Sequence, residues 1–203
     1  MRRLPFTETD EVVAALGTAV RVLADGGVVV VPTESFYGLA ADPRRDEAVR
    51  LIHALKGRPS DLGLPVLCAD WQQVESLVEV PERFRVKLSR IWPAALTVVL
   101  AIREPIPAAA CGTLAVRIPG HPALRALLYR SGPLTGTSAN GHGKPPAVTI
   151  DEAVASMTFQ PELALDAGRT AGGDPSTLVD LTGDRPRVLR PGRVPWEVSY
   201  PEC

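Results

Sequence analysis

Apolar residues along the chain follow two spacings, one typical of amphipathic helices and one typical of buried strands. Apolar positions that recur every three or four residues predict helices at residues 10–25, 46–55, 70–77, 81–92 and 121–130, with one more after Thr149. Short apolar runs between them, rich in β-branched residues, predict strands. These runs lie at residues 28–31, 64–68, 95–102, 113–118, 134–137, 163–167, 177–181 and 187–189.

The predicted helices carry start signals. Thr9 or Asp10 is expected to cap the first helix, because a side-chain oxygen at this position accepts a bond from an unpaired backbone N–H. Residues 70–73 and 149–152 have the spacing of a capping box. Pro81 suits the first turn of another helix, where its missing N–H costs nothing.

The stretch from Gly27 to Arg58 combines a strand, a polar loop and a helix. Val28–Val31 is a run of four valines, which suits a strand that is buried on both faces. The strand is expected to stop at Pro32, and residues 33–38 then form a turn-rich loop. The following helix should end at Gly57, since glycine is the usual residue after a helix.

Two cations, Lys56 and Arg58, flank this glycine and are expected to face the hydroxyl-rich loop. Cations and hydroxyl groups at the end of a buried strand predict an anion-binding site. The alternative for Lys56 is that it complements the dipole at the end of its helix. The alternative for Arg58, which precedes a proline, is a solvated turn residue.

Strands and helices mix without a strict β-α-β period, so we expect an α/β fold with one twisted sheet of mixed parallel and antiparallel strands flanked by helices. No segment has the composition of a linker, and one domain over residues 1–203 is predicted. The formal net charge of −1 and the isoelectric point near 6.3 exclude a global cationic field, so any basic site must be local.

Cysteine usage and hydropathy indicate a cytoplasmic protein. The three cysteines, Cys68, Cys111 and Cys203, are far apart and form no C-x-x-C pair, which predicts neither disulfides nor a zinc site. No apolar run reaches about 18 residues, and the amino terminus lacks the apolar core of a signal peptide. The three histidines share no metal-ligand spacing and are expected to be structural or exposed.

The standard nucleotide-binding motifs are missing. Gly143-Lys144 is followed by Pro145, and Ser138 stands where a Walker loop would open with glycine. Phosphate neutralisation would therefore depend on side chains such as Lys56 and Arg58, with Ser138 and Arg190 from distant segments. Ser138 and Asn140 also fit an ordinary turn.

Arg117 interrupts an apolar strand, where an unpaired charge would cost several kcal/mol. It is therefore expected to have a partner. Either it binds an anionic ligand or it forms a structural ion pair, and the sequence leaves both open.

Five blocks in order resemble the YrdC-like threonylcarbamoyl-AMP synthase family, in its short form. They are Pro32-Thr33-Glu34-Ser35 with Tyr37-Gly38-Leu39, Lys56-Gly57-Arg58-Pro59, Ala115-Val116-Arg117, Thr137-Ser138-Ala139-Asn140, and Pro175-Ser176-Thr177 ahead of Leu189-Arg190-Pro191-Gly192. The resemblance covers about residues 10–193, with a short tail at 194–203. It differs from the usual pattern at Ala94, where glycine is common, and within residues 62–67, where an Asn or His is common.

The resemblance implies a YrdC-like fold and a nucleotidyltransferase that condenses L-threonine, bicarbonate and ATP to threonylcarbamoyl-AMP and pyrophosphate. This is a step towards N6-threonylcarbamoyladenosine in tRNA, so a downstream tRNA-modification enzyme is an expected partner. Mg²⁺ would be held mainly by the nucleotide phosphates, with no metal site on the protein. The implied threonine ligands are Thr33, Arg117 and Ser176; the implied ATP ligands are Lys56, Arg58, Thr113, Ser138, Pro146 and Arg190; and the implied catalytic residues are Lys56, Arg58, Ser138 and Asn140.

Other readings remain open. An RNA-binding module would use a basic patch of Lys56, Arg58, Arg117, Lys144, Arg169, Arg190 and Arg193, and the near-neutral net charge predicts that such binding is weak. A paralogue that carbamoylates or adenylates a different acceptor is a second alternative. A hydrolase built on Ser138 is a third, although residues 136–140 are one residue short of a nucleophile elbow.

Overall fold

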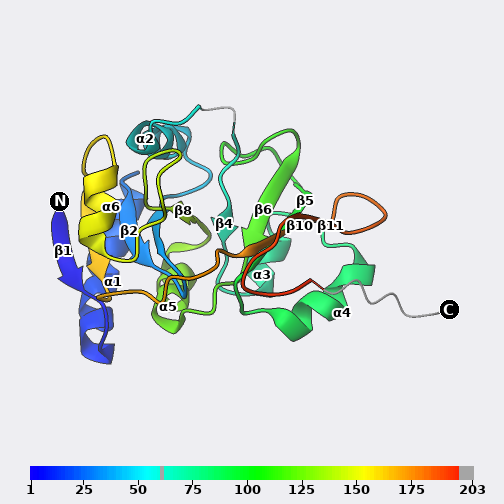
Figure 1. The fold of residues 1–203 in the computed structure, drawn as a ribbon, viewed down its shortest axis with the longest axis horizontal. Helices are drawn as coiled ribbons and strands as arrows, with labels where there is room; N and C mark the ends of the chain where they lie inside the picture. Colours follow the sequence, from blue (N-terminus) through cyan, green and yellow to red (C-terminus); the bar gives the residue numbers. More distant parts are fainter. Residues whose placement is uncertain (60–61, 197–203) are drawn as a thin grey trace.

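The computed structural model describes residues 1–59 and 62–196, so Cys203 and most of the predicted tail lie outside the described part (Figure 1). Its helices are α1 (Thr9–Ala24), α2 (Asp46–Lys56), α3 (Trp71–Glu75), α4 (Glu82–Ile91), α5 (Pro122–Ser131) and α6 (Ile150–Ser156). Its strands are β1 (Arg2–Pro5), β2 (Val29–Pro32), β3 (Tyr37–Ala40), β4 (Val66–Leu67), β5 (Leu96–Ala101), β6 (Thr113–Arg117), β7 (Leu134–Thr135), β8 (Thr137–Ser138), β9 (Leu163–Asp166), β10 (Thr177–Asp180) and β11 (Arg187–Arg190).

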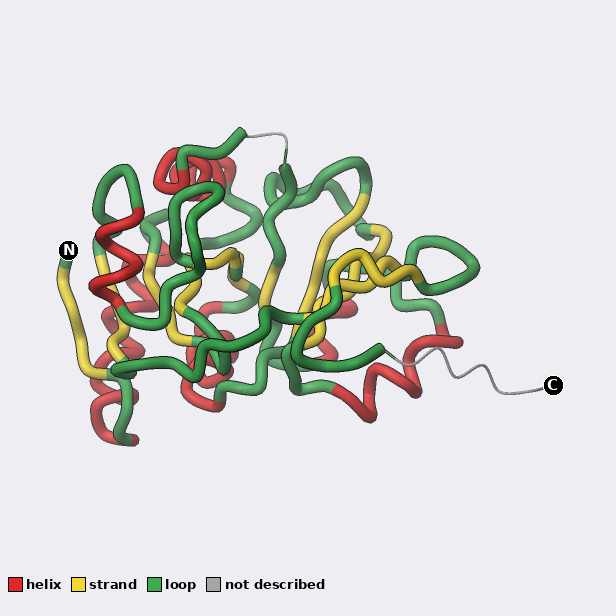
Figure 2. The backbone as a smooth tube through the Cα atoms, in the orientation of Figure 1, coloured by secondary structure: helices red, strands yellow, loops and turns green. Residues whose placement is uncertain are grey.

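The strands form two sheets, not the one sheet that the sequence predicted (Figure 2). One sheet has five strands in the order β1-β9-β2-β3-β8, and the other has six in the order β11-β10-β5-β6-β4-β7. Both contain parallel and antiparallel pairs, which confirms the predicted mixed α/β class.

The segment 134–137, predicted as one strand, forms two short strands that belong to different sheets. β7 belongs to the six-stranded sheet and β8 to the five-stranded sheet, with Gly136 between them. Thr135 of β7 connects the two sheets by hydrogen bonds to β3 and the residue after it. Its N–H donates to the carbonyl of Ala41 at 2.8 Å, and its Oγ1 donates to the carbonyl of Leu39 at 3.1 Å.

Gly136 is required at this crossing because its backbone approaches a buried leucine. A Cβ there would lie 2.4 Å from Cγ of Leu67. We expect Gly136→Ala to lower the free energy of unfolding by roughly 1–3 kcal/mol, measured by urea titration. Gly17→Ala is the matched control: a Cβ at this helical position meets nothing within 4 Å, so about 0.5–1 kcal/mol of stabilisation is expected. An unchanged midpoint for Gly136→Ala would contradict the close approach.

The run of four valines is buried on both faces, as predicted. Val29 and Val31 pack under α1 and α5, whereas Val28 and Val30 pack into the larger core that includes α2. β2 is the central strand of the five-stranded sheet, so the turn at residues 33–36 begins at the end of a strand that is buried on both faces.

Two strands and one cap differ from the predictions. The predicted loop 33–38 ends earlier, because Tyr37 and Gly38 begin β3 and pair antiparallel with β2. β1 was not predicted, since its few apolar residues gain a partner only from β9, far away in the sequence. Glu8, not Thr9 or Asp10, is the N-cap of α1.

Candidate functional site

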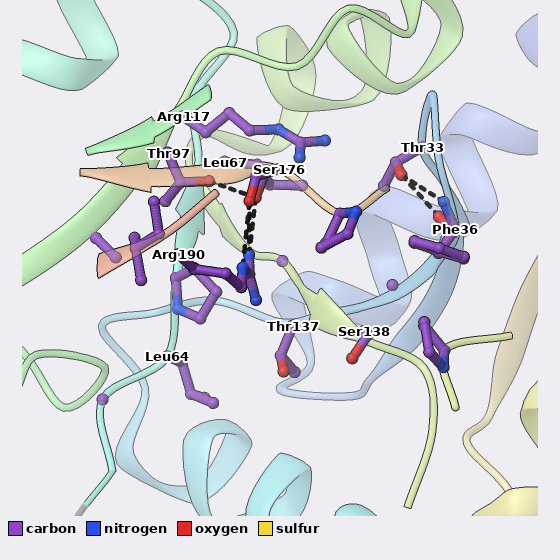
Figure 3. A pocket seen from close by; sticks show the side chains of 18 of the residues that line it. Thr33, Phe36, Leu64, Leu67, Thr97, Arg117, Thr137, Ser138, Ser176 and Arg190 are labelled. Atoms are coloured by element: carbon purple, nitrogen blue, oxygen red, sulfur yellow. Dashed lines mark hydrogen bonds between the residues drawn. The ribbon is translucent and has the colours of Figure 1, made fainter. Parts of the chain in front are cut away.

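A cavity of about 590 Å³ gathers most of the predicted site residues (Figure 3). Its walls come from β3 and β8 of one sheet and from β5, β6 and β10 of the other. The sheets and their loops thereby bring distant blocks of the sequence together. The predicted residues that line it are Thr33, Arg58, Thr113, Arg117, Ser138, Asn140, Pro146, Ser176 and Arg190.

Arg117, the last residue of β6, is the buried cation of this cavity. Only 7% of it is exposed, and its Nη2 donates to Oε2 of Glu34 at 2.9 Å. Burial lowers the pKa of the guanidinium, the charge of Glu34 opposes this shift, and nearby Arg190 adds to it. The structural ion pair that the sequence left open is therefore present.

This ion pair is incompletely satisfied. Nε of Arg117 and Oε1 of Glu34 are both buried without a hydrogen-bond partner among the described residues. Because Arg117 also lines the cavity and its Nη2 accounts for the contact with Glu34, part of the guanidinium remains available to an anion. The sequence did not single out Glu34 as the partner, although it lies beside Thr33 in the same block.

Thr33 reaches the cavity from the turn between β2 and β3. Its Oγ1 accepts bonds from the backbone N–H groups of Ser35 and Phe36, each at 3.2 Å, and donates to the carbonyl of Phe36 at 2.7 Å (Figure 3). The hydroxyl therefore holds the shape of the turn as well as lining the cavity.

Ser176 reaches the cavity from the opposite sheet, immediately before β10. Its Oγ accepts from Oγ1 of Thr97 at 2.9 Å and from Nη2 of Arg190 at 3.2 Å, and its carbonyl accepts from the same Nη2 at 2.9 Å (Figure 3). Arg190 is thus fixed along the cavity wall. Thr97 was not predicted, because nothing in an apolar strand marks it as a site residue.

Lys56 is the predicted residue that does not line the cavity, as far as the described residues define it. It is 5% exposed, and its Nζ donates to the carbonyl oxygens of Ser138 at 2.5 Å and Asn140 at 2.7 Å. Burial, with the nearby charge of Arg58, lowers the pKa of this ammonium to about 8. The ammonium therefore holds the backbone of the 138–140 segment without lining the cavity itself.

Asn140 closes the loop that follows this segment. Its Nδ2 donates to the carbonyls of Gly141 at 3.0 Å and Lys144 at 2.6 Å. This loop brings Lys144 to the cavity wall. The sequence had indicated Lys144 only as part of the alternative RNA-binding patch. Arg58, which also lines the cavity, donates through Nη2 to the carbonyls of Leu62 at 3.1 Å and Gly63 at 3.0 Å.

The charges of the cavity are one-sided. Four cationic side chains line it, Arg58, Arg117, Lys144 and Arg190, and none of the described lining residues is Asp or Glu. Such a surface favours a ligand with several negative charges, because each phosphate or carboxylate meets a cation and none meets a like charge.

The three histidines lie on different elements. His53 is buried in α2, His142 is exposed, and Nδ1 of His121 caps α5 by accepting from the N–H of Leu124 at 3.3 Å, which agrees with the predicted structural roles. Across residues 1–59 and 62–196, no three His, Cys, Asp or Glu side chains are grouped as metal ligands. Within the same residues, no helix has the length and apolar character to span a membrane.

The fold and the cavity together define a small-molecule-binding protein whose site is built between two mixed sheets and favours an anionic ligand. The family model described as "Telomere recombination", Sua5/YciO/YrdC, matches residues 21–192. The chain belongs to this family, which confirms the predicted resemblance.

Individual relatives agree with this assignment. A Pseudomonas aeruginosa protein named threonylcarbamoyl-AMP synthase is 37% identical over 180 residues, covering 85% of this chain and 95% of its own. A Mycobacterium tuberculosis relative is 38% identical over 184 residues, covering 89% of this chain and 85% of its own. The crystal structure of Pyrococcus abyssi Sua5 complexed with L-threonine is 33% identical, has a TM-score of 0.86 and covers 95% of this chain, which spans 58% of that structure.

Proposed function

We propose that this protein is a threonylcarbamoyl-AMP synthase, a nucleotidyltransferase that acts on L-threonine, bicarbonate and ATP. The observation that carries the proposal is that the residues expected to bind threonine and, apart from Lys56, those expected to bind the nucleotide line one cavity. The name of the Pseudomonas relative and the threonine complex of the Pyrococcus protein support it.

The charge of the cavity supports a nucleotide and an amino acid bound together. ATP carries up to four negative charges and threonine carries one carboxylate, and the four lining cations, of which Arg117 already pairs with Glu34, can offset part of this charge. Arg58, Lys144 and Arg190 would contact the phosphates with Ser138, while Thr113 and Pro146 would complete the nucleotide wall. Mg²⁺ would enter with ATP, bound mainly by its phosphates.

Arg117 would bind the threonine carboxylate, with Thr33 and Ser176 on either side of it. A guanidinium can hold a carboxylate through two parallel N–H bonds, which also orients the amino group. The contact with Glu34 fixes the guanidinium before the substrate arrives, so little orientational freedom is lost on binding.

The proposed chemistry balances without a covalent enzyme intermediate. The neutral amine of threonine attacks the carbon of bicarbonate, a C–N bond forms, and water leaves to give the carbamate. A carbamate oxygen then attacks the α-phosphorus, and the bond between this phosphorus and the bridging oxygen breaks to release pyrophosphate. The chain would contribute by holding both substrates in line and neutralising charge, since neither step needs a nucleophilic side chain.

The alternative RNA-binding patch is weakened by burial. Lys56 is 5% exposed and Arg117 is 7% exposed, so neither can reach a polynucleotide backbone. Of the other patch residues, Arg58, Lys144 and Arg190 line the cavity. We propose weak tRNA contact at most, cytoplasmic location, and transfer of the product to a downstream tRNA-modification enzyme.

The direct test is product analysis with purified protein. Pyrophosphate release from ATP is expected to require both threonine and bicarbonate, and mass spectrometry is expected to detect threonylcarbamoyl-AMP. Omitting threonine or replacing it with another amino acid is the control. Release that ignores threonine would refute the assignment, and release with a different amine would favour the paralogue with another acceptor.

A further inference from the structure

The segment Arg190–Val194, here called the strap, begins at the last residue of β11 and packs against the loop that carries Ser176 (red chain after β11 in Figure 1). Gly192 allows the closest contact: a Cβ there would lie 2.3 Å from the carbonyl oxygen of Pro175 and 2.6 Å from the nitrogen of Thr177. A larger residue would therefore displace the strap from this loop.

Arg193 connects the strap to two further loops. Its backbone N–H donates to the carbonyl of Pro175 at 2.9 Å. Its guanidinium donates through Nη1 to the carbonyl of Glu34 at 3.4 Å and through Nη2 to the carbonyl of Gly172. The N–H of Gly172 in turn donates to the carbonyl of Ser35 at 2.8 Å. One side chain thus joins the strap to the turn after β2, directly and through a second loop.

Glu34 links Arg193 to Arg117, which lines the cavity. Its carbonyl receives Arg193, and its carboxylate holds the buried guanidinium of Arg117 at 2.9 Å. A shift of the Glu34 backbone would move that carboxylate and change the direction in which Arg117 faces the cavity. Arg193 is not among the described residues that line the cavity, so its contacts lead to the cavity through these neighbours.

Arg190, at the other end of the strap, is held independently of Arg193. It pairs with Leu178 of β10 and donates to the carbonyl of Ser176 at 2.9 Å. Loss of the Arg193 guanidinium should therefore disturb the side of the cavity that contains Thr33 and Arg117, and leave Arg190 in place.

We propose that Arg193 is a positioning residue for the amino-acid half of the site, which sets the turn at residues 33–36 and, through Glu34, the orientation of Arg117. The inference rests on the proposed function in one respect: the ligand of Arg117 is taken to be the threonine carboxylate. The guanidinium is suited to this role because its planar fork donates to the two carbonyls from two separate nitrogens, Nη1 and Nη2, whereas an ammonium would have to reach both from one nitrogen.

The test compares Arg193→Met, which keeps a long apolar side chain and removes every donor, with Arg193→Lys, which keeps the charge and a single donor nitrogen. Calorimetric titration of Arg193→Met is expected to show about tenfold weaker threonine binding and ATP binding within about twofold of wild type. Arg193→Lys should recover only part of the threonine affinity. Arg50→Met, which removes an exposed arginine paired with Asp46 on α2, is the matched control and should change neither.

Hydrogen exchange of the ligand-free proteins provides a readout that needs no substrate. The amide of Gly172 and the amides of residues 33–36 are expected to exchange faster in Arg193→Met than in wild type, with little change elsewhere. Threonine affinity equal to wild type would overturn the inference. So would an equal loss of both ligands with faster exchange throughout the protein, since that pattern indicates general destabilisation. A wild type that binds threonine but makes no adenylate would refute the proposed function alone.

Discussion

Arg117→Lys is expected to weaken threonine binding by roughly 1–3 kcal/mol and to leave ATP binding nearly unchanged. Lysine keeps the positive charge but replaces five N–H donors in a plane by one ammonium. In the native protein Nη2 is already engaged by Glu34 at 2.9 Å, so the ligand must use the other donors. An ammonium cannot serve both carboxylates with the same geometry. Calorimetric titration of each ligand separately, with a melting curve for each variant, is the measurement.

Arg117→Ala would be a poorer test because it leaves Glu34 without its partner. Breaking a buried pair in this way typically costs about 3–5 kcal/mol, and an unfolded variant would mimic loss of binding. Arg58→Ala is the useful counterpart, since Arg58 is proposed to face the nucleotide. This substitution should weaken ATP binding and leave threonine binding unchanged. If folded Arg117→Lys binds threonine as wild type does, or loses ATP instead, Arg117 is a structural or phosphate-binding residue.

The sequence predicted the strands and helices that have a strong local pattern. Four consecutive valines indicated a strand between two packed layers, and the structure places them in two separate cores. β1 was missed because Arg2 and Arg3 give no apolar alternation, and its stability comes from pairing with β9. The division into two sheets was missed because it depends on which neighbours Thr135 and Gly136 meet, and no local pattern records that.

The sequence predicted which residues belong to the candidate site, and the structure shows where their side chains lie and which partners they contact. Arg117 was recognisable because a charge inside an apolar strand requires a partner, yet the sequence could not choose between a ligand and an ion pair. The structure shows the pair with Glu34 and also places Arg117 on the cavity wall. Lys144 was named only in the alternative RNA-binding patch and not among the ATP ligands, since its place on the cavity wall depends on a loop that Asn140 holds by a bond to the Lys144 carbonyl.

Lys56 is the clearest case in which residue type and location give different roles. The sequence predicts a phosphate ligand, whereas the structure directs the ammonium at two backbone carbonyls behind the cavity wall. We expect Lys56→Met to lower the free energy of unfolding by roughly 2–4 kcal/mol at pH 9.5, because the carbonyls of Ser138 and Asn140 lose their shared donor. ATP binding should also weaken, since these carbonyls belong to the segment that presents Ser138 to the cavity.

The size of this destabilisation should depend on pH. The pKa of Lys56 is about 8 in the folded protein and 10.5 ordinarily, so between these values the unfolded chain binds more protons. The free energy of unfolding of the wild type therefore gains a contribution that rises with pH above 8, and this contribution is absent in Lys56→Met. The deficit of the variant should grow by about 2 kcal/mol from pH 7 to pH 9.5, because each pH unit in this window adds about 1.4 kcal/mol.

Urea titrations of both proteins at pH 7 and pH 9.5, followed by circular dichroism, measure this difference. Subtracting the free energy of unfolding of the variant from that of the wild type at each pH removes the contributions of the other titrating groups, which the two proteins share. Lys144→Met is the control: it removes an exposed lysine, leaves no buried carbonyl without a donor, and should cost less than about 0.5 kcal/mol. A deficit for Lys56→Met that is the same at both pH values would show that the folded protein does not penalise the ammonium. No deficit at either pH would show that the 138–140 segment keeps its shape without Lys56.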